Sequence, residues 1–285
     1  MTILVTGSTS PFGRRLISVL RDSRREKVIG VARRALPDED VVPCDVTDRD
    51  NLTAIVASTR PRLVFHLAAS YDSVFDASLS VNAGSAQTLL EATAKTASET
   101  RVVLIGSAAE YGAVPPEENP VTESRALAPV SLYGMGKAIQ TQVASHYARD
   151  RGSDVVVARM FNLRMPGLAE RLFMGRVERA IEAVTSGRQS TIRVGNLDAV
   201  RDYVDGEDAI RQLLDIATLG APGEVYHVAS GRPTRIGDLL DELLAEAGLD
   251  RSIVETVPVQ TVRPGYDVPV IYADMSRTQA LRANR

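Results

Sequence analysis

The chain has 285 residues, 44% of them hydrophobic, and a formal net charge of −3 at pH 7. This length suits one large α/β domain with a smaller lobe, and the interspersed charges indicate neither a nucleic-acid nor a membrane partner. No apolar run approaches the ~20 residues that span a bilayer, and no signal peptide precedes the first apolar run. The single Cys44 excludes an internal disulfide and is expected to be a small packing residue. We therefore expect a cytoplasmic protein.

Short apolar runs alternate with helical patterns in the first part of the chain. Strands at 2–6, 27–31, 41–44, 63–67, 102–105 and 155–160 are predicted from these runs. Strands that alternate with helices imply right-handed βαβ units and a parallel sheet. We therefore predict an α/β fold with a doubly wound, Rossmann-type parallel sheet and a smaller C-terminal substrate-binding lobe.

A glycine-rich turn joins the first predicted strand to a helical pattern. Gly7 and Gly13 bound this turn, and Ser10 stands where the middle glycine of Gly-x-x-Gly-x-x-Gly would be. Strand, glycine turn and helix together direct backbone N–H groups at an anion, as in sites for a dinucleotide pyrophosphate. The Cβ of Ser10 crowds that position, although its hydroxyl can cap the helix or bond a phosphate oxygen.

The end of the second predicted strand bears on the cofactor. In NAD enzymes an acidic residue about 20 positions past the glycine turn bonds the ribose 2′-hydroxyl, whereas an Arg there accommodates a 2′-phosphate. Arg33 and Arg34 stand at that place, with Arg14 near the turn. Two arginines after a strand are also common as solvated surface charges. Their position favours NADP(H) over NAD(H).

Tyr133 and Lys137 are four residues apart and would share one face of a helix. A neighbouring ammonium favours phenolate, so we expect Lys137 to pull the Tyr133 pKa down from its ordinary value of about 10. Ser107, at the end of a predicted strand, would share a substrate oxygen with Tyr133. A Tyr-x-x-x-Lys pair alone also occurs on ordinary surface helices, and it gains weight here from the glycine turn.

The regular alternation of strands and helices ends after Asn162. We assign 1–162 and 200–222 to a nucleotide-binding domain, and 163–199 and 223–285 to the smaller lobe. Ligands of such folds bind outside the carboxyl ends of the strands. The lobe is therefore expected to hold the substrate.

Together these motifs resemble the extended branch of the short-chain dehydrogenase/reductase superfamily, the NAD-dependent epimerase/dehydratase family, and in particular its GDP-sugar members. The resemblance covers nearly the whole chain and implies a homodimer without a metal site. It implies that Ser107, Tyr133 and Lys137 are catalytic. The implied cofactor contacts are Gly7, Ser10, Phe12, Gly13, Arg33, Arg34, Asp45, Val46, Leu67, Ala68, Ala69, Tyr133 and Lys137. The implied substrate contacts are Ser107, Asn162, Arg201 and Arg263.

The residues after Ser107 bear on the reaction. The 4,6-dehydratases of the family carry acidic residues where this chain has Ala108 and Ala109, and alanine does no acid–base work. The resemblance thus implies that NADPH reduces the C4 ketone of a nucleoside-diphosphate 4-keto-6-deoxy sugar while Tyr133 donates the proton. Glu110 is expected to point to the other side of an extended segment, where contact with the sugar and a structural role are both open.

Two other interpretations remain open. A 4-epimerase of nucleotide sugars would use the same three catalytic residues but keep NAD tightly bound. A non-catalytic, NADP-sensing regulator would keep the fold; Ser10 favours it mildly, and the intact catalytic residues argue against it. The base, the sugar and the product stereochemistry depend on the shape of the pocket.

Overall fold

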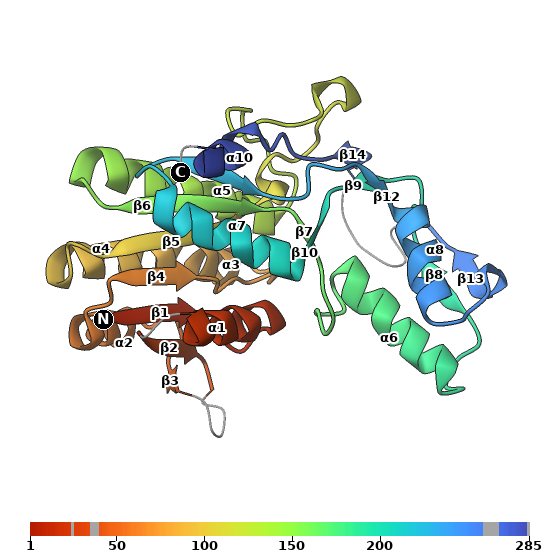
Figure 1. The fold of residues 1–285 in the computed structure, drawn as a ribbon, viewed down its shortest axis with the longest axis horizontal. Helices are drawn as coiled ribbons and strands as arrows, with labels where there is room; N and C mark the ends of the chain where they lie inside the picture. The colour runs from red at the N-terminus through yellow and green to blue at the C-terminus, as the bar shows by residue number, and fades with distance from the viewer. Residues whose placement is uncertain (24–25, 35–39, 259–267, 284–285) are drawn as a thin grey trace.

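The computed structural model describes residues 1–285 except 24–25, 35–39, 259–267 and 284–285. A seven-stranded sheet of order β11-β6-β5-β4-β1-β2-β3 forms the centre of the larger body (Figure 1). Every neighbouring pair in this sheet is parallel. The predicted α/β fold with a parallel, Rossmann-type sheet is confirmed. The strands are β1 (Thr2–Thr6), β2 (Lys27–Ala32), β3 (Val41–Pro43), β4 (Leu63–His66), β5 (Arg101–Ser107), β6 (Val155–Met160) and β11 (Val225–Val228).

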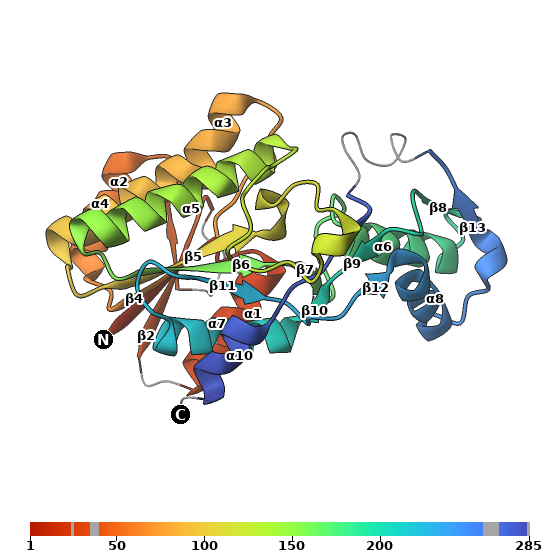
Figure 2. The same ribbon diagram turned by 90° about the horizontal axis from the view of Figure 1, so that it is seen from above.

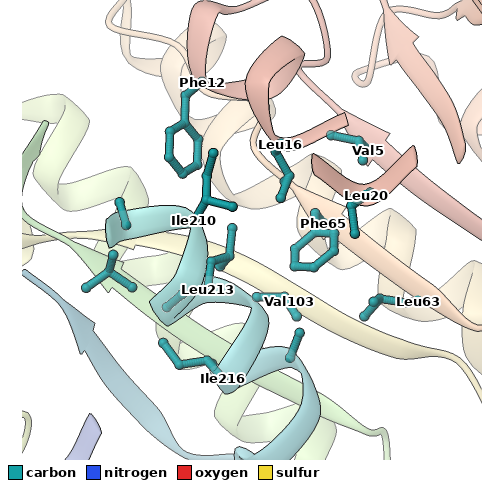
Figure 3. Packing of buried hydrophobic residues seen from close by; sticks show 14 of the residues in the cluster. Val5, Phe12, Leu16, Leu20, Leu63, Phe65, Val103, Ile210, Leu213 and Ile216 are labelled. Carbon is teal, nitrogen blue, oxygen red and sulfur yellow. The ribbon is translucent and has the colours of Figure 1, made fainter. Parts of the chain in front are cut away.

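Both faces of the sheet are buried, because successive side chains of a strand alternate between two apolar clusters. On β1, Val5 joins one cluster and Leu4 the other. In the first cluster, Leu16 and Leu213 pack over Phe65 of the sheet (Figure 3). The helices of the first cluster are α1 (Pro11–Ser23) and α7 (Gly206–Leu219), and those of the second are α2 (Arg49–Thr59), α4 (Ser85–Thr96) and α5 (Leu132–Arg151).

The structure differs from the predicted division of the chain near its C-terminus. β11 pairs in parallel with β6, and α10 (Ser276–Ala283) packs against α7 and β11. Both elements belong to the larger body, although they lie in the range 223–285 that we assigned to the smaller lobe. The four-residue run of β11 is too short to show its partner, and its place in the sheet depends on the crossover through α7.

The smaller lobe is built from α6 (Phe173–Thr185), β8 (Ile192–Val194), α8 (Ile236–Glu246) and β13 (Val254–Thr256), with β13 parallel to β8. Its own apolar cluster includes Val177, Ile192 and Leu240. In Figures 1 and 2 these elements lie beyond the edge where the strand arrows of the large sheet end. The lobe therefore faces the carboxyl ends of the strands, where ligands of such folds bind.

Short elements join the two bodies. The strands are β7 (Asn162–Arg164), β9 (Val200–Arg201), β10 (Tyr203–Asp205), β12 (Thr234–Arg235) and β14 (Val270–Ile271). The remaining elements are α3 (Phe75–Leu79), a π-helical turn (Ser80–Gly84) and 3₁₀ turns at Ala108–Glu110, Pro116–Glu118 and Arg251–Ile253.

Within the described ranges, no helix combines the length and apolarity needed to cross a membrane, and no group of three potential metal ligands is found.

Candidate active site

Glycines close the turn between β1 and α1. Gly7 has a φ of 67°, and a Cβ there would lie 2.9 Å from the backbone N of Ala68. A Cβ on Gly13 would lie 2.6 Å from the carbonyl oxygen of Gly7. Only glycine lets the chain turn this tightly at the start of the helix.

Ser10, at the position of the middle glycine, folds into the turn. Its hydroxyl donates to the carbonyl oxygen of Gly7 (2.9 Å) and accepts from the backbone N of Gly13 (3.1 Å). The second bond caps α1, which is one of the two roles expected from the sequence. The hydroxyl thus stabilises the turn.

The turn fits a dinucleotide. Ser8 is fully buried, and its hydroxyl has no hydrogen-bond partner in the described part of the chain. This hydroxyl lies beside Gly30 of β2, where a Cβ would approach it to 2.8 Å. Phe12 turns its side chain into the first apolar cluster (Figure 3). An orphaned polar atom beside a helix N-terminus suits the phosphates and ribose of a nucleotide.

Two strand ends meet at the expected adenosine position. Asp45, after β3, accepts hydrogen bonds from the backbone N (2.9 Å) and hydroxyl (2.8 Å) of Thr47. These bonds first, and then the charge of Arg33, lower the pKa of Asp45. Arg33 and Arg34 are both exposed, and Val46 is buried in the second apolar cluster. The structure therefore brings Arg33 and Asp45 together.

The segment after β4 lies against the glycine turn. The backbone N of Ala68 donates to the Thr6 hydroxyl (3.2 Å) at the end of β1. Leu67 and Ala68 pack against opposite apolar clusters, and Ala69 is exposed. Cys44 is buried, and burial raises its pKa to about 11, as expected for a packing residue.

Ser107 ends β5 and begins a 3₁₀ turn. Its hydroxyl accepts from the backbone N of Ala109 (3.2 Å), and the Glu110 carboxylate accepts from the backbone N of Ser107 (2.7 Å). These reciprocal bonds form a capping box. The segment is therefore not extended as we expected, because the two caps bend it into a turn.

Glu110 points back into the protein. It is fully buried and forms an ion pair with Arg159 of β6 (2.8 Å). The hydroxyl of Thr141 donates to the same carboxylate at 2.8 Å. Among the two roles left open by the sequence, this geometry favours the structural one, with Glu110 holding the backbone of Ser107.

Glycines bring the start of α5 close to its neighbours. The hydroxyl of Ser131 caps the helix by accepting from the backbone N of Gly134 (3.1 Å). A Cβ on Gly134 would collide with the carbonyl oxygen of Ala109, and one on Gly136 would lie 2.9 Å from the Cβ of Asn82. Small residues at both places therefore let the helix carry its side chains to the turn after Ser107.

Lys137 is buried one turn beyond Tyr133. Its ammonium donates to the carbonyl oxygen of Ile105 (2.8 Å) and to the side-chain oxygen of Gln140 (3.0 Å). Burial lowers its pKa to about 8, and the negative charge of Glu110 acts against this shift. Two acceptors therefore fix the position of the Lys137 ammonium. Because its charge is directed at them, it favours the phenolate form of Tyr133 less than a free ammonium would.

The pKa of Tyr133 is raised well above its ordinary value. Burial is the largest cause, followed by the neighbouring Tyr71, while a hydrogen-bonding interaction with Ser107 lowers it and Glu110 raises it. The Tyr133 pKa therefore shifts in the direction opposite to the one expected from Lys137. The loss of water around the phenol raises this pKa more than the Lys137 charge, which is directed at other acceptors, lowers it. The structure does bring Ser107 and Tyr133 together, and the phenol is held in its protonated form.

The expected substrate contacts lie where β7 meets β10. The side-chain nitrogen of Asn162 donates to the carbonyl oxygen of Asp202 (3.1 Å). The Arg201 guanidinium donates to the carbonyl oxygen of Val200 (2.9 Å). Because Asn162 pairs with Tyr203, the structure brings the predicted Asn162 and Arg201 close in space. Arg263 lies outside the described residues.

Asn82 holds the loop after β4 in place, a role that sequence reasoning did not predict. Its side-chain oxygen accepts from the backbone N of Ser70 (3.0 Å), and its nitrogen donates to the carbonyl oxygen of Ser70 (2.7 Å). It stands in the π-helical turn Ser80–Gly84, a type of irregularity that is frequent at functional sites. Two hydrogen bonds to one backbone unit fix the loop after β4.

A profile of the NAD dependent epimerase/dehydratase family matches residues 3–229. The chain belongs to this family. Its members are NAD(P)-dependent enzymes that modify nucleotide sugars, and they include reductases, dehydratases, dehydrogenases and epimerases.

Three relatives illustrate the similarity. GDP-6-deoxy-D-mannose reductase of Pseudomonas aeruginosa is 29% identical over 152 residues, which are 53% of this chain and 50% of the relative. The dTDP-6-deoxy-L-talose 4-dehydrogenase (NAD(P)(+)) of Kitasatospora kifunensis is 28% identical over 89% of this chain and 81% of its own. The structure of MoeE5 in complex with UDP-glucuronic acid and NAD is 26% identical with a TM-score of 0.83, over 99% of this chain and 92% of that chain. The match to the reductase thus spans half of its length.

Proposed function

We propose that the protein uses NADPH to reduce the C4 ketone of a nucleoside-diphosphate 4-keto-6-deoxy sugar, with a GDP-sugar favoured. One observation carries this proposal: Ser107 and Tyr133 meet in a site whose neighbouring Glu110 is engaged by Arg159. Ketone reduction needs one proton donor beside the hydride source. A 4,6-elimination also needs a base at C5 and an acid for the leaving hydroxyl.

The chain's residues act on the oxygen of the ketone. A bound nicotinamide cofactor supplies the hydride that the C4 carbon receives. The Ser107 hydroxyl donates a hydrogen bond to the ketone oxygen, and Tyr133 gives its proton to that oxygen as negative charge develops. Solvent returns a proton to the phenolate once the product has left the site. General acid catalysis of this kind contributes about 10²–10⁴-fold.

The remaining predicted residues hold the two ligands. The turn between Gly7 and Gly13 contacts the pyrophosphate, and Arg33 with Arg34 contacts the 2′-phosphate. Lys137, one helical turn from Tyr133, stabilises the phenolate after proton transfer and bonds the nicotinamide ribose. Asp45 and Val46 after β3, and Leu67, Ala68 and Ala69 after β4, are the other proposed cofactor contacts, whereas the Phe12 side chain lies in the core.

Substrate recognition is assigned to Asn162 for the diphosphate and to Arg201 and Arg263 for the nucleotide. The planar fork of arginine suits phosphate and base recognition. Arg201, in β9, has only 9% of its surface exposed. A ligand bound there would therefore contact the guanidinium in a place that is largely shielded from bulk water.

The test is a screen of purified protein with NADPH and a panel of nucleoside-diphosphate 4-keto-6-deoxy sugars. We expect NADPH absorbance to fall and a product heavier by two hydrogens to form. GDP-mannose should yield no 4-keto-6-deoxy product, because Ala108 and Ala109 supply neither acid nor base. Interconversion of C4 epimers without added NADPH would contradict the reductase and favour the epimerase.

We also infer that the protein is a homodimer located in the cytoplasm. Exposed apolar side chains gather where α3 meets the start of α5, including Val74 (60% exposed), Phe75 (48%) and Met135 (39%). Apolar surface of this kind is often covered by a partner. Sedimentation analysis of the wild type and of Phe75→Glu tests the assembly, and a monomeric wild type would contradict it.

A further inference from the structure

A tyrosine outside the predicted site covers the ring of Tyr133. Tyr71 lies in the loop after β4, and its ring stacks on that of Tyr133 with 4.0 Å between the centroids and 14° between the planes. The Cζ atom of Arg171 lies 4.2 Å from the centroid of Tyr71. Two groups this close to one ring must occupy its opposite faces. Arg171, Tyr71 and Tyr133 therefore form one three-layer stack.

The stack is anchored at both ends of the site. The loop that carries Tyr71 is held at Ser70 by the two hydrogen bonds from Asn82. Asn82 in turn packs against Gly136 of α5, the helix that carries Tyr133. Arg171 belongs to the segment that leads into α6 of the smaller lobe. Tyr71 is therefore a side chain whose backbone is tied to the helix of the proton donor.

Arg171 has no carboxylate within ion-pair distance among the residues that the structure describes. Its guanidinium instead lies over the face of the Tyr71 ring, where the cation is attracted by the negative face of the aromatic system. Tyr71 keeps 42% of its surface exposed. The cation thus covers part of a ring that would otherwise be freer to leave Tyr133.

We propose that Tyr71 is a positioning residue for Tyr133, that its ring keeps water from the phenol and holds it beside Ser107, and that Arg171 retains Tyr71 in this place. The consequence for activity rests on the proposed proton-donor role of Tyr133. The stack itself is testable without any substrate.

The groups that act on the phenol come from several elements. Burial raises the pKa of Tyr133 most; Tyr71 from the loop after β4 and Glu110 from the 3₁₀ turn raise it further, and Ser107 at the end of β5 lowers it. Lys137 on α5 faces the carbonyl oxygen of Ile105. Removal of Tyr71 therefore lets water reach the Tyr133 phenol while the charges of Glu110 and Lys137 stay in place.

The first experiment titrates Tyr133 directly by NMR of protein labelled at the ζ carbon of tyrosine. The Tyr133 signal is identified by its loss in Tyr133→Phe. We expect Tyr71→Ala to lower its titration midpoint by about one pH unit or more, since burial and a phenol neighbour are both lost. Tyr71→Phe keeps the stack and should give a smaller shift. Tyr147→Phe, which removes a phenol elsewhere on α5 whose hydroxyl donates to Glu91, is the matched control.

An unchanged Tyr133 midpoint in Tyr71→Ala would overturn the proposal. Intact NADPH binding and an unfolding temperature near that of wild type show that each variant is folded. Should Tyr71→Ala fail to fold, the titration of Tyr71→Phe decides, and it is expected to lower the midpoint because the neighbouring phenol is lost. No shift in that variant would overturn the proposal as well.

The second experiment measures ketone reduction. We expect Tyr71→Ala to lower kcat by about 10-fold or more, to leave NADPH affinity unchanged and to move the alkaline limb of the pH profile toward lower pH. Arg171→Met should lower kcat by a smaller factor, and Arg188→Met, whose guanidinium pairs with Glu182, should not. A shifted Tyr133 titration with unchanged kcat and pH profile would overturn the positioning role. A protein that reduces no ketone would contradict the proposed function, while the titration still decides on the stack.

Discussion

The two ends of the candidate site are built in different ways. At the cofactor end, Ser10 bonds to Gly7 and Gly13, so the turn is closed by residues within one short segment. At the reacting end, Ser107 comes from β5 and Tyr133 from α5. The first kind of site is contained in a local motif. The second exists only when the strands and helices have packed.

A buried polar network extends from the reacting end. Arg159 donates to the Tyr111 hydroxyl (2.7 Å), which lies 2.6 Å from Nε2 of His227. Nδ1 of His227 lies 2.8 Å from the carbonyl oxygen of Asp274, so this nitrogen carries the proton and Nε2 accepts from Tyr111. Because Glu110 holds both Ser107 and Arg159, the network ties the reacting end to the segment before α10. The glycine turn also contacts β2 and the segment after β4, but the hydrogen bonds of Ser10 that close it lie within the turn itself.

The largest expected effect tests the reacting end alone. Tyr133→Phe removes the proton donor and keeps the ring, so kcat should fall by about 10²–10⁴-fold with NADPH affinity nearly unchanged. Steady-state kinetics and cofactor titration measure the two quantities. Tyr147→Phe, on the same helix with its hydroxyl donating to Glu91 (3.0 Å), is the control. More than about a tenth of wild-type kcat in Tyr133→Phe, with chemistry rate-limiting, would exclude Tyr133 as the donor.

A second prediction compares the stability of the two ends. Glu110→Ala leaves Arg159 buried and unpaired, which should lower the free energy of unfolding by about 3–5 kcal/mol. Ser10→Ala removes one local cap and should cost about 0.5–2 kcal/mol. Urea unfolding followed by circular dichroism measures both. Equal losses would break the distinction between a local turn and a long-range network.

The third prediction concerns the cofactor end. Arg33→Ala and Arg34→Ala should lower the preference for NADPH over NADH, because a charge-assisted contact with a 2′-phosphate is worth about 1.5–3 kcal/mol, or roughly 10–150-fold. The ratio of kcat/KM for the two cofactors measures this preference. Arg193→Ala in the smaller lobe serves as the control. Equal use of both cofactors by wild type, unchanged in the double variant, would argue that these arginines are plain surface charges.

The fourth prediction is a loss of stability in acid. Burial lowers the pKa of His66, beside the glycine turn, to about 3, and that of His227, in the network, to about 4. The unfolded chain takes up these protons near pH ~6.5 while the folded chain does not. Each histidine therefore contributes stability that is complete above pH ~6.5 and lost as pH falls toward its folded pKa, by up to about 1.4 kcal/mol per pH unit.

Unfolding free energies measured from neutral to mildly acidic pH test this slope. His227→Gln should make the free energy of unfolding fall less steeply with decreasing pH. A wild-type free energy of unfolding that is flat over this range would show that the two buried imidazoles do not remain neutral in the folded state.

Sequence periodicity predicted the sheet but missed one strand. The runs at 2–6, 63–67 and 155–160 are apolar because β1, β4 and β6 are covered on both faces of the sheet. Their composition is therefore enough to predict buried strands. β11 carries a tyrosine and a histidine in four residues, and its neighbour β6 lies far away along the chain. Such a strand can be assigned only from its pairing with β6 in the folded structure, because its own residues show no strand pattern.

The sequence by itself determined the fold class, the glycine turn and the residue types of the reacting end, because each rests on spacing within one segment. Tertiary structure alone decided that Glu110 turns inward to Arg159, that Lys137 faces Ile105 and Gln140, and that the Tyr133 pKa rises. The physical reason is that charge and burial depend on which groups surround an atom and on how much water they exclude. Those neighbours come from segments that only the packed fold brings together.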